Sequence, residues 1–184
     1  MSNIWITSDH HFGHANILKF VGQDGKPFRH DADVHTMNEA LVEAWNSVVK
    51  PEDIVYHLGD VAFANSLHYV NQLNGLKHLA LGNHDRFRMT EYYAVGFLSV
   101  RGSFKRNRNI LMSHFPIHAS SISRGAIQIH GHIHQRPSPK GPYFNVSVER
   151  NAYRPFHLDE ILKWQDDYLA GLEMDSFLRE MGSS

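Results

Sequence analysis

Five short polar stretches, each placed at the end of an apolar run, most constrain how this chain can fold. They are Asp9-His10-His11, Gly59-Asp60, Gly82-Asn83-His84-Asp85, Ser113-His114 and Gly131-His132-Ile133-His134. The apolar runs before them are short and rich in β-branched residues, which is typical of buried strands. If those strands pair, the polar stretches meet at one end of a sheet. Because Asp, His and Asn all bind metal ions, the pattern predicts a metal site there.

The composition indicates a single globular domain spanning residues 1–184. A chain of 184 residues with 42% hydrophobic and 20% charged residues can bury one core, and no linker divides it. The formal net charge of −1 gives no general basic surface, so there is no strong nucleic-acid signature. No apolar run approaches the length of a membrane span, and no signal-peptide pattern opens the chain. We expect no membrane association and a monomer or homodimer.

The chain has no cysteine and fifteen histidines. The first fact excludes disulfides, thiolate zinc sites and cysteine nucleophiles, and it fits a reducing compartment, so we expect a cytoplasmic protein. The histidines form no tag-like run, and their number is high for this length. Together these facts favour a metal site built from nitrogen and oxygen ligands.

Hydrophobic spacing predicts an α/β arrangement in the first half of the chain. Residues 4–7, 53–58 and 78–81 have the pattern of strands, and residues 33–49 and 66–73 have the pattern of helices. Alternating strands and helices at this spacing indicate parallel pairing with right-handed crossovers.

The second half has a different pattern and predicts a mixed or antiparallel sheet. Short strands without long helices between them are expected at residues 97–100, 109–112, 126–130 and 143–148. A helix at about residues 159–181, interrupted near Gly171, closes the chain. We expect it to pack on the core, with a dimer contact as the alternative.

Two Asp or His pairs have a spacing of two residues. Alternate residues of a strand leave it on the same face, so Asp9 and His11 can hold one ion while His10 points away. His132 and His134 repeat this spacing. A polar loop after a strand is the alternative for either pair alone.

The remaining stretches add single candidate ligands. Gly59 lets the backbone turn sharply, so that the carboxylate of Asp60 can approach two cations. Asn83 offers an amide oxygen, and His114 follows an apolar run. Each of these two residues is alternatively only a helix cap or a turn residue.

In this order, the five stretches resemble the signature of the calcineurin-like metallophosphoesterase superfamily. The resemblance spans roughly residues 4 to 148, and its most distinctive parts are Gly-Asn-His-Asp at 82–85 and Gly-His-x-His at 131–134. It implies a four-layer αββα sandwich, in which two central mixed β-sheets are flanked by helices and the ligands lie on loops at the sheet edge.

The resemblance also implies a dinuclear site. It assigns Asp9, His11, Asp60 and His134 to one metal ion, and Asp60, Asn83, His114 and His132 to the other, so that Asp60 bridges them. The nitrogen and oxygen ligands suit divalent ions, with manganese expected first and iron, zinc, cobalt or nickel as alternatives. Two such ions would activate a hydroxide as the nucleophile.

His84 and Asp85 are the catalytic residues that the resemblance implies. His84 would protonate the leaving oxygen without binding a metal, and Asp85 would orient the His84 imidazole.

Other polar residues near the stretches have two interpretations. One interpretation is contact with substrate, and the other is an ordinary structural role as a cap or a solvated side chain. Both apply to His14, Asn16, His118, Arg86, Arg124 and Arg136. His10, His57 and His130 either orient the ligands or are buried histidines with satisfied hydrogen bonds. Residues 105–108 form a basic patch that we interpret as a polar hairpin turn.

We therefore expect a metal-dependent phosphoesterase, most readily a phosphodiesterase, because a chain of this length leaves little room for a cap domain over the site. A phosphomonoesterase or a nucleotide pyrophosphatase would use the same ligands. A binding scaffold of the same fold is the non-enzymatic alternative, and the presence of every expected ligand and of His84 argues against it.

Overall fold

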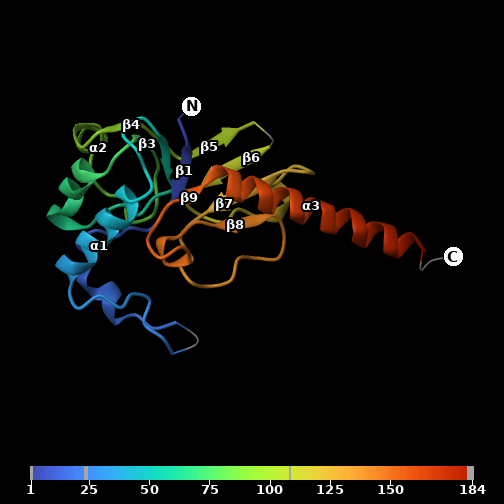
Figure 1. Ribbon diagram of the computed structural model, residues 1–184, viewed down its shortest axis with the longest axis horizontal. Coiled ribbons are helices and arrows are strands. Elements are labelled where there is room, and N and C mark those ends of the chain that lie inside the picture. The colour runs from blue at the N-terminus through green and yellow to red at the C-terminus, as the bar shows by residue number, and fades with distance from the viewer. Residues whose placement is uncertain (1, 23–24, 108, 182–184) are drawn as a thin grey trace.

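The computed structural model describes residues 2–22, 25–107 and 109–181 (Figure 1). Its strands form two sheets, each containing both parallel and antiparallel pairs. The five-stranded sheet has the order β4-β3-β2-β1-β9, with strands Phe97–Arg101, Leu76–Ala80, Ile54–His57, Ile4–Thr7 and Phe156–His157. The four-stranded sheet has the order β5-β6-β7-β8, with strands Ser103–Arg106, Ile110–Ser113, Ile127–His130 and Tyr143–Asn145.

Within the described ranges, three α-helices and four 3₁₀ helices accompany the sheets. The α-helices are α1 at Val34–Asn46, α2 at Met89–Ala94 and α3 at Leu158–Met181. The 3₁₀ helices are η1 at Ala15–Lys19, η2 at Ala64–Gln72, η3 at Ala119–Ser121 and η4 at Val148–Arg150. None of the helices in the part of the chain that the structure describes is long and apolar enough to cross a membrane.

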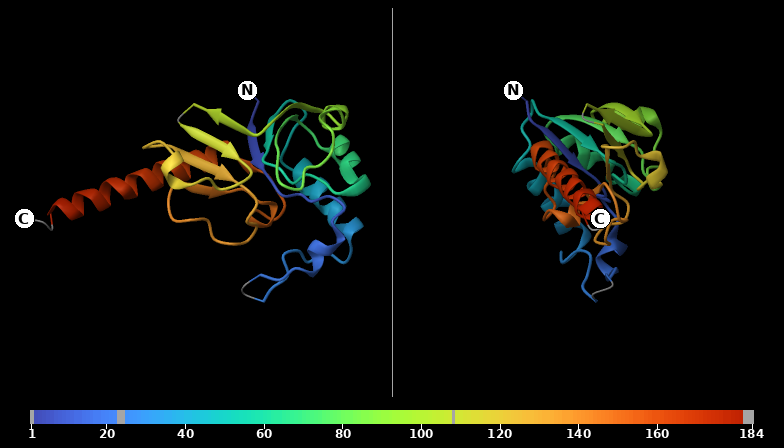
Figure 2. Two further views of the ribbon diagram at one scale, coloured as in Figure 1. Left: turned by 180° about the vertical axis from the view of Figure 1, so that it is seen from behind. Right: turned by 90° about the vertical axis from the view of Figure 1, so that its right-hand side faces the viewer.

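Residues that alternate along the strands of the five-stranded sheet face two different cores. Val55 and Leu79 pack with Met37, Leu41 and the other buried residues of α1, under the helices on one side of the sheet. Residues on the opposite face enter a second apolar cluster, which also holds side chains of the four-stranded sheet and of α3; among its members are Ile6, Ala80, Met112, Ile129 and Ile161. The expected α/β sandwich, with two mixed sheets flanked by helices, is confirmed (Figures 1 and 2).

Helix α1 shows how local sequence fixes one flank of the sandwich. Asp33 is extended and caps the helix, because its side chain accepts a 2.8 Å hydrogen bond from the backbone N–H of Thr36. Trp45 is fully buried, and its indole N–H donates to the carbonyl of Asn74 at 3.0 Å. The cap starts the helix and the tryptophan fixes its other end to the loop before β3.

Two predictions about secondary structure need correction, and two strands were not predicted. The strand expected at 97–100 belongs to the first sheet, because β4 pairs in parallel with β3 rather than joining the later strands. The segment near 66–73 is the 3₁₀ helix η2, which is bent at Asn65. Strands β5 and β9 were not predicted, since the end of β5 overlaps the basic patch and β9 has only two residues.

Lys105 and Arg106 of the basic patch are the last two residues of strand β5, which pairs antiparallel with β6, so they belong to a strand rather than to a turn. Arg106 donates to the Tyr56 hydroxyl at 3.1 Å, which ties the hairpin to the first sheet. Arg108 lies outside the described residues.

Helix α3 is continuous through Gly171, so the predicted interruption is wrong. Glycine lowers helix propensity by only about 1 kcal/mol, which the remaining residues outweigh. The first turns bury Ile161 against the second core, and Trp164 packs beside Phe144 with ring centroids 5.2 Å apart. The later turns extend away from both sheets (Figures 1 and 2), so only the first part of the helix packs on the core as expected.

Candidate metal centre

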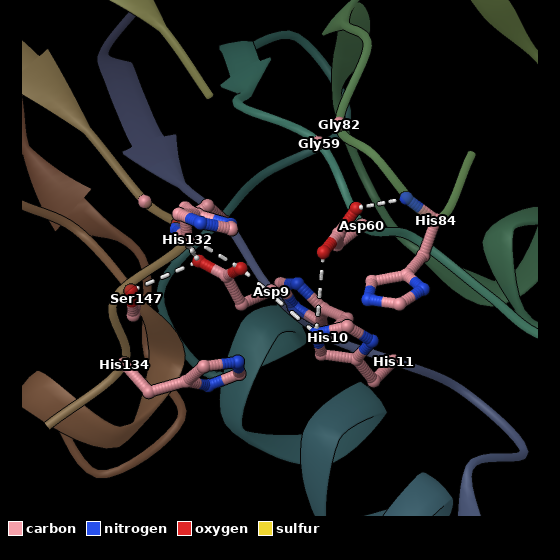
Figure 3. Close-up of polar contacts among 12 residues, drawn as sticks. Asp9, His10, His11, Gly59, Asp60, Gly82, His84, His132, His134 and Ser147 are labelled. Atoms are coloured by element: carbon pink, nitrogen blue, oxygen red, sulfur yellow. Dashed lines mark hydrogen bonds and ion pairs between the residues drawn. The ribbon is translucent and has the colours of Figure 1, made fainter. Parts of the chain in front are cut away.

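The five polar stretches meet at the carboxyl ends of strands from both sheets. Strands β1, β2 and β3 run parallel in one sheet, and β6 and β7 run parallel in the other. Ligands and substrates commonly bind at the carboxyl ends of parallel strands. Figure 3 shows labelled side chains from both sheets, among them Asp9, Asp60, His132 and His134, pointing toward one another.

Two groups of three side chains each place their candidate ligand atoms within 4.8 Å of one another. One group is Asp9, His11 and His134, and the other is Asp60, His114 and His132. These are six of the seven residues that the resemblance implies as ligands. The seventh, Asn83, joins the second group, because its side-chain oxygen lies 2.9 Å from His114 Nε2.

Asp60 lies between the two groups. Its Oδ2 is 3.4 Å from His114 Nε2 in one group and 3.6 Å from His11 Nε2 in the other. Its Oδ1 accepts a 2.8 Å hydrogen bond from the backbone N–H of His84. One carboxylate oxygen is thus fixed by the protein while the other faces histidines of both groups.

The candidate ligands converge through left-handed backbone rather than through strand alternation. Five of them have positive φ: Asp9 (62°), His11 (52°), Asp60 (58°), His132 (69°) and His134 (51°). Strand β1 ends at Thr7 and β7 ends at His130, so both pairs lie beyond their strands. The strand geometry given as the reason for the pairing is therefore wrong. Asp9 and His11 do belong to one group, whereas His132 and His134 belong to different groups. Non-glycine residues in this conformation are strained by about 1–3 kcal/mol each, and such strain concentrates at functional sites.

Glycines next to the ligands allow the close approach of the backbone segments. A Cβ atom added to Gly82 would overlap with the carboxylate of Asp60, and one added to Gly131 would overlap with Ser8 and Asp9. The glycine of each motif is therefore a packing requirement as well as a turn residue.

Arg29, which the sequence analysis did not identify, holds the strained Asp9-His10 segment. Its guanidinium donates to the carbonyl oxygens of Asp9 and His10, both at 2.6 Å. It also donates to Glu149 Oε1 at 3.0 and 2.9 Å, and Glu149 Oε1 lies 3.1 Å from His134 Nδ1. Arg29 and Glu149 thus link both ends of the first group. No local pattern reveals the pair, because 120 positions separate its members.

Asp9 is oriented by hydroxyl and amide donors. Its Oδ2 accepts hydrogen bonds from Ser8 at 2.5 Å and Ser147 at 2.9 Å, and its carboxylate also accepts from the backbone N–H of His132. Ser147 follows β8 at the same edge of the sheet. These bonds fix the carboxylate next to His134.

Asp85 does not contact the imidazole of His84, so its predicted role is corrected. Its carboxylate accepts backbone hydrogen bonds from Asp60 and Gly82, both at 2.8 Å, and from Val61 at 3.0 Å. Three backbone donors occupy the two oxygens, and no hydrogen bond between described residues joins Asp85 to the His84 ring. Asp85 therefore fixes the loop that carries Asp60.

Burial and neighbouring charges set the pKa values of the candidate ligands. Burial lowers the pKa of His11 well below its usual value, and His134 and Arg29 lower it further. Burial would lower the pKa of His114, but the carboxylates of Asp60 and Asp9 outweigh it and raise that pKa. Burial would raise the pKa of Asp60, yet hydrogen bonding and charge from His114 lower it.

Both ring nitrogens of His11 are buried and make no hydrogen bond with the residues that the structure describes. An unsatisfied buried donor or acceptor costs about 1–3 kcal/mol. A divalent cation bound by Asp9, His11 and His134 would satisfy one of these nitrogens, so the donor set fits a metal ion.

His10, His57 and His130 are buried behind the ligands. His57 Nε2 lies 2.9 Å from His10 Nδ1, and His57 Nδ1 accepts from the backbone N–H of Gly59 at 3.2 Å. His130 contacts the carbonyl of Gly131 and the Ser138 hydroxyl. His10 points away from both groups, as predicted, and these histidines support the loops rather than the ligand atoms.

The suggested substrate residues lie in different places. His14 precedes η1, and its side chain does not cap that helix; its ring stacks on Phe63 with centroids 4.3 Å apart. Arg86 lines a pocket beside His84. Asn16 is exposed and accepts a bond from Lys19, and His118 is exposed and contacts Ser120.

Arg124 does not lie at the metal groups. It precedes β7, whose carboxyl end carries His132 and His134, so the length of the strand separates Arg124 from them. Its predicted contact with substrate is corrected for this reason. Arg136 is exposed, and its backbone N–H donates to Ile133.

No model of a known protein family matches the chain. The uncharacterized protein MJ1445 of Methanocaldococcus jannaschii is 34% identical over 179 residues, which cover 89% of this chain and 91% of that protein. The chain belongs to the same family as MJ1445. The gene 66 protein of Mycobacterium phage D29 is 31% identical over 169 residues, covering 74% of this chain and 80% of the phage protein.

Solved structures support the fold of this family member. The protein of unknown function AQ665 from Aquifex aeolicus matches with a TM-score of 0.67 and 25% identity, over 89% of this chain and all of that chain. A novel archaeal phosphodiesterase matches with a TM-score of 0.47 and 17% identity, over 79% of this chain and 82% of that chain. The second likeness is too weak to bear on activity.

Proposed function

We propose that this protein is a metal-dependent phosphoesterase of the calcineurin-like superfamily that hydrolyses a phosphodiester. The observation that carries the proposal is the position of Asp60, whose Oδ2 faces a histidine of each group at 3.4 and 3.6 Å. A carboxylate shared by two sets of nitrogen and oxygen ligands is the arrangement that a dinuclear hydrolase needs.

The residues present fit two divalent cations. Asp9, His11, Asp60 and His134 would hold one, and Asp60, Asn83, His114 and His132 would hold the other, with manganese as the first choice. Bound there, the cations would supply Lewis acidity and a hydroxide nucleophile at neutral pH. The chain contributes the fixed carboxylates and the strained loops that bring the imidazoles together.

His84 is the proposed general acid. Its backbone N–H donates to Asp60, so its position is tied to the bridging carboxylate, and its ring centroid lies 5.6 Å from that of His11. The ring is partly exposed and makes no ion pair with any residue in the described ranges. It can therefore donate a proton to the leaving oxygen of a phosphate held at the two groups.

The test compares esters on metal-loaded protein. Protein reconstituted with Mn²⁺, Co²⁺, Ni²⁺ or Zn²⁺ is assayed with bis(p-nitrophenyl) phosphate and p-nitrophenyl phosphate, with EDTA as control. We expect faster turnover of the diester with bound metal and none with EDTA. Preference for the monoester would indicate a phosphomonoesterase. No turnover of either ester despite two bound ions would indicate a scaffold.

A substitution separates catalysis from metal binding. His84→Ala should lower kcat by about 10²–10⁴-fold while metal content, measured by elemental analysis, stays at the wild-type value. His35→Ala is the matched control, since the His35 side chain is 70% exposed on α1 and lies far along the chain from the five polar stretches, next to Glu39. Full activity of His84→Ala would exclude the assigned role.

A further inference from the structure

A pocket of about 260 Å³ opens beside His84 and is not used by either metal group. Six residues line it: Ala62, Phe63, Ala64, His84, Arg86 and Phe87. Pockets for whole small-molecule ligands have volumes of roughly 300–1,000 Å³, so this one suits a single ring system rather than an entire substrate. Its lining combines two phenyl rings with one histidine and one arginine.

The two aromatic walls are held by packing against their neighbours. The Phe63 ring stacks on His14 at a centroid distance of 4.3 Å and lies 5.2 Å from the His84 ring. The Phe87 ring packs edge to face on the fully buried Tyr92 ring at 5.9 Å. Rings fixed in this way lose little freedom when a ligand binds, which favours recognition of a rigid planar group.

Backbone strain and an unpaired charge mark the same pocket. Ala64, which follows directly after Phe63, has a positive φ of 46°. Such an angle is rare for a residue other than glycine. Arg86 is exposed, and its side chain makes no hydrogen bond or ion pair with the residues that the structure describes. A guanidinium of this kind can donate to acceptor atoms at the edge of a planar ring.

We propose that this pocket receives the leaving group of the substrate and that this group carries a planar aromatic ring. The inference rests on the proposed function and names its substrate class. During hydrolysis, a water loses a proton to solvent and forms a new P–O bond while the P–O bond to the leaving group breaks. The leaving oxygen takes a proton from His84, which regains one from solvent. Since His84 lines the pocket, whatever is attached to that oxygen extends into it.

A pair of diesters tests the ring preference by turnover. Methyl phenyl phosphate and methyl hexafluoroisopropyl phosphate have leaving groups of similar acidity, but only the first carries a ring. We expect Mn²⁺-loaded wild type to favour the phenyl ester. Phe87→Leu should lower the ratio of the two kcat/KM values by about 2- to 10-fold, as expected for loss of one aromatic contact. Tyr93→Leu, an exposed aromatic residue on α2 outside the pocket, should leave the ratio unchanged.

Binding tests the same pocket without turnover. Calorimetry of the Mn²⁺-loaded protein should show tighter binding of phenylphosphonate than of cyclohexylphosphonate, and Phe87→Leu should remove the difference. Equal affinities in wild type, together with an unchanged kcat/KM ratio in Phe87→Leu, would overturn the inference. Turnover without ring preference would contradict the subsite while the proposed function stands. Ring-dependent binding without any turnover would contradict the function and leave a ring-binding pocket.

Discussion

The two ends of the five-stranded sheet each hold a buried aspartate, but they hold it differently. At the amino end, Asp53 accepts hydrogen bonds from the Asn3 backbone at 2.8 Å, the Trp5 indole at 2.9 Å and the Lys50 backbone at 3.0 Å. At the carboxyl end, Asp60 sits on left-handed backbone, and one of its oxygens faces His11 and His114.

The difference separates stability from function within one sheet. The amino end satisfies its buried polar atoms with ordinary backbone geometry. The carboxyl end keeps buried imidazole nitrogens without hydrogen-bond partners and relies on Arg29 and Asp85 to hold its loops. Such strain persists only where the surrounding structure enforces it, and it is typical of binding sites. A substitution of Asp53 at the amino end should therefore lower the free energy of unfolding and leave metal binding unchanged. A substitution of Asp60 at the carboxyl end should weaken metal binding and change stability little.

The largest effect should come from Asp60→Asn. The substitution removes the negative charge that both groups share, so we expect both metal ions to bind more weakly and turnover to fall by several orders of magnitude. The melting temperature of the metal-free protein should change little. Metal content and kcat, measured together on the purified variant, check this. Retention of two tightly bound ions would show that Asp60 does not join the groups.

Arg29→Met should affect both stability and metal binding. It leaves the buried Glu149 without its cation, and removing one partner of a buried pair costs about 3–5 kcal/mol in free energy of unfolding. Affinity for one of two metal ions should fall by about 10–100-fold, because Arg29 and Glu149 hold Asp9 and His134. Denaturant titration and metal titration measure the two effects.

The double variant Arg29→Met with Glu149→Leu tests whether the unpaired carboxylate of Glu149 causes the loss of stability. It removes both partners, so much of the lost stability should return while metal affinity stays low. A double variant as unstable as the single one would show that lost packing, rather than the unpaired carboxylate, causes the destabilisation.

Asp85→Asn should have a smaller effect, centred on the Asp60 loop. The amide cannot accept all three backbone hydrogen bonds, so the loop loosens and turnover should fall by about 10–100-fold. The pH profile of kcat distinguishes the two roles of Asp85. A loop role leaves the shape of the profile unchanged, whereas direct contact with His84 would shift the limb that reports the general acid.

Asp53→Asn should lower the stability of the fold without affecting metal binding or turnover. Burial would raise the pKa of Asp53, but hydrogen bonds from Lys50, Trp5 and Asn3 outweigh it and lower that pKa. The carboxylate thus stabilises the fold above the unfolded pKa of about 3.9, and this contribution is lost as pH falls through the lower folded pKa.

We expect Asp53→Asn to reduce the free energy of unfolding by about 1–3 kcal/mol at pH 7, with a smaller difference from wild type below about pH 4. Metal content and kcat of the folded variant should match wild type. Melting curves across this pH range provide the measurement. A loss of metal would show that the two ends of the sheet are coupled.

Much of the fold could be predicted because hydrophobic periodicity is local. Strands β1, β2, β3, β6 and β7 and helix α1 lie where the pattern placed them, within a few residues. The errors arose where local pattern carries little information. Strand β4 has the same appearance in either sheet, and only its pairing with β3 decides where it belongs.

The candidate site divides in the same way. The residue types and spacing of Asp9, His11, His132 and His134 predicted a metal site there. Asp9, His11 and His134 form one group, and His132 belongs to the other. Their positive φ angles were not predicted, since nothing in the pair Asp-x-His distinguishes a strand end from a left-handed loop. Asp85 was assigned to its neighbour His84, whereas its carboxylate reaches backbone amides of another loop.

The sequence alone determined which side chains are available for a metal site and that they follow strands, because both properties belong to single residues and their near neighbours. Tertiary structure decided which sheet each strand joins, that Asp60 lies between the two groups, and that Arg29 and Glu149 meet across 120 positions. These contacts depend on how distant segments pack. The free energy that stabilises them comes from the whole core, and no single motif contains enough information to predict them.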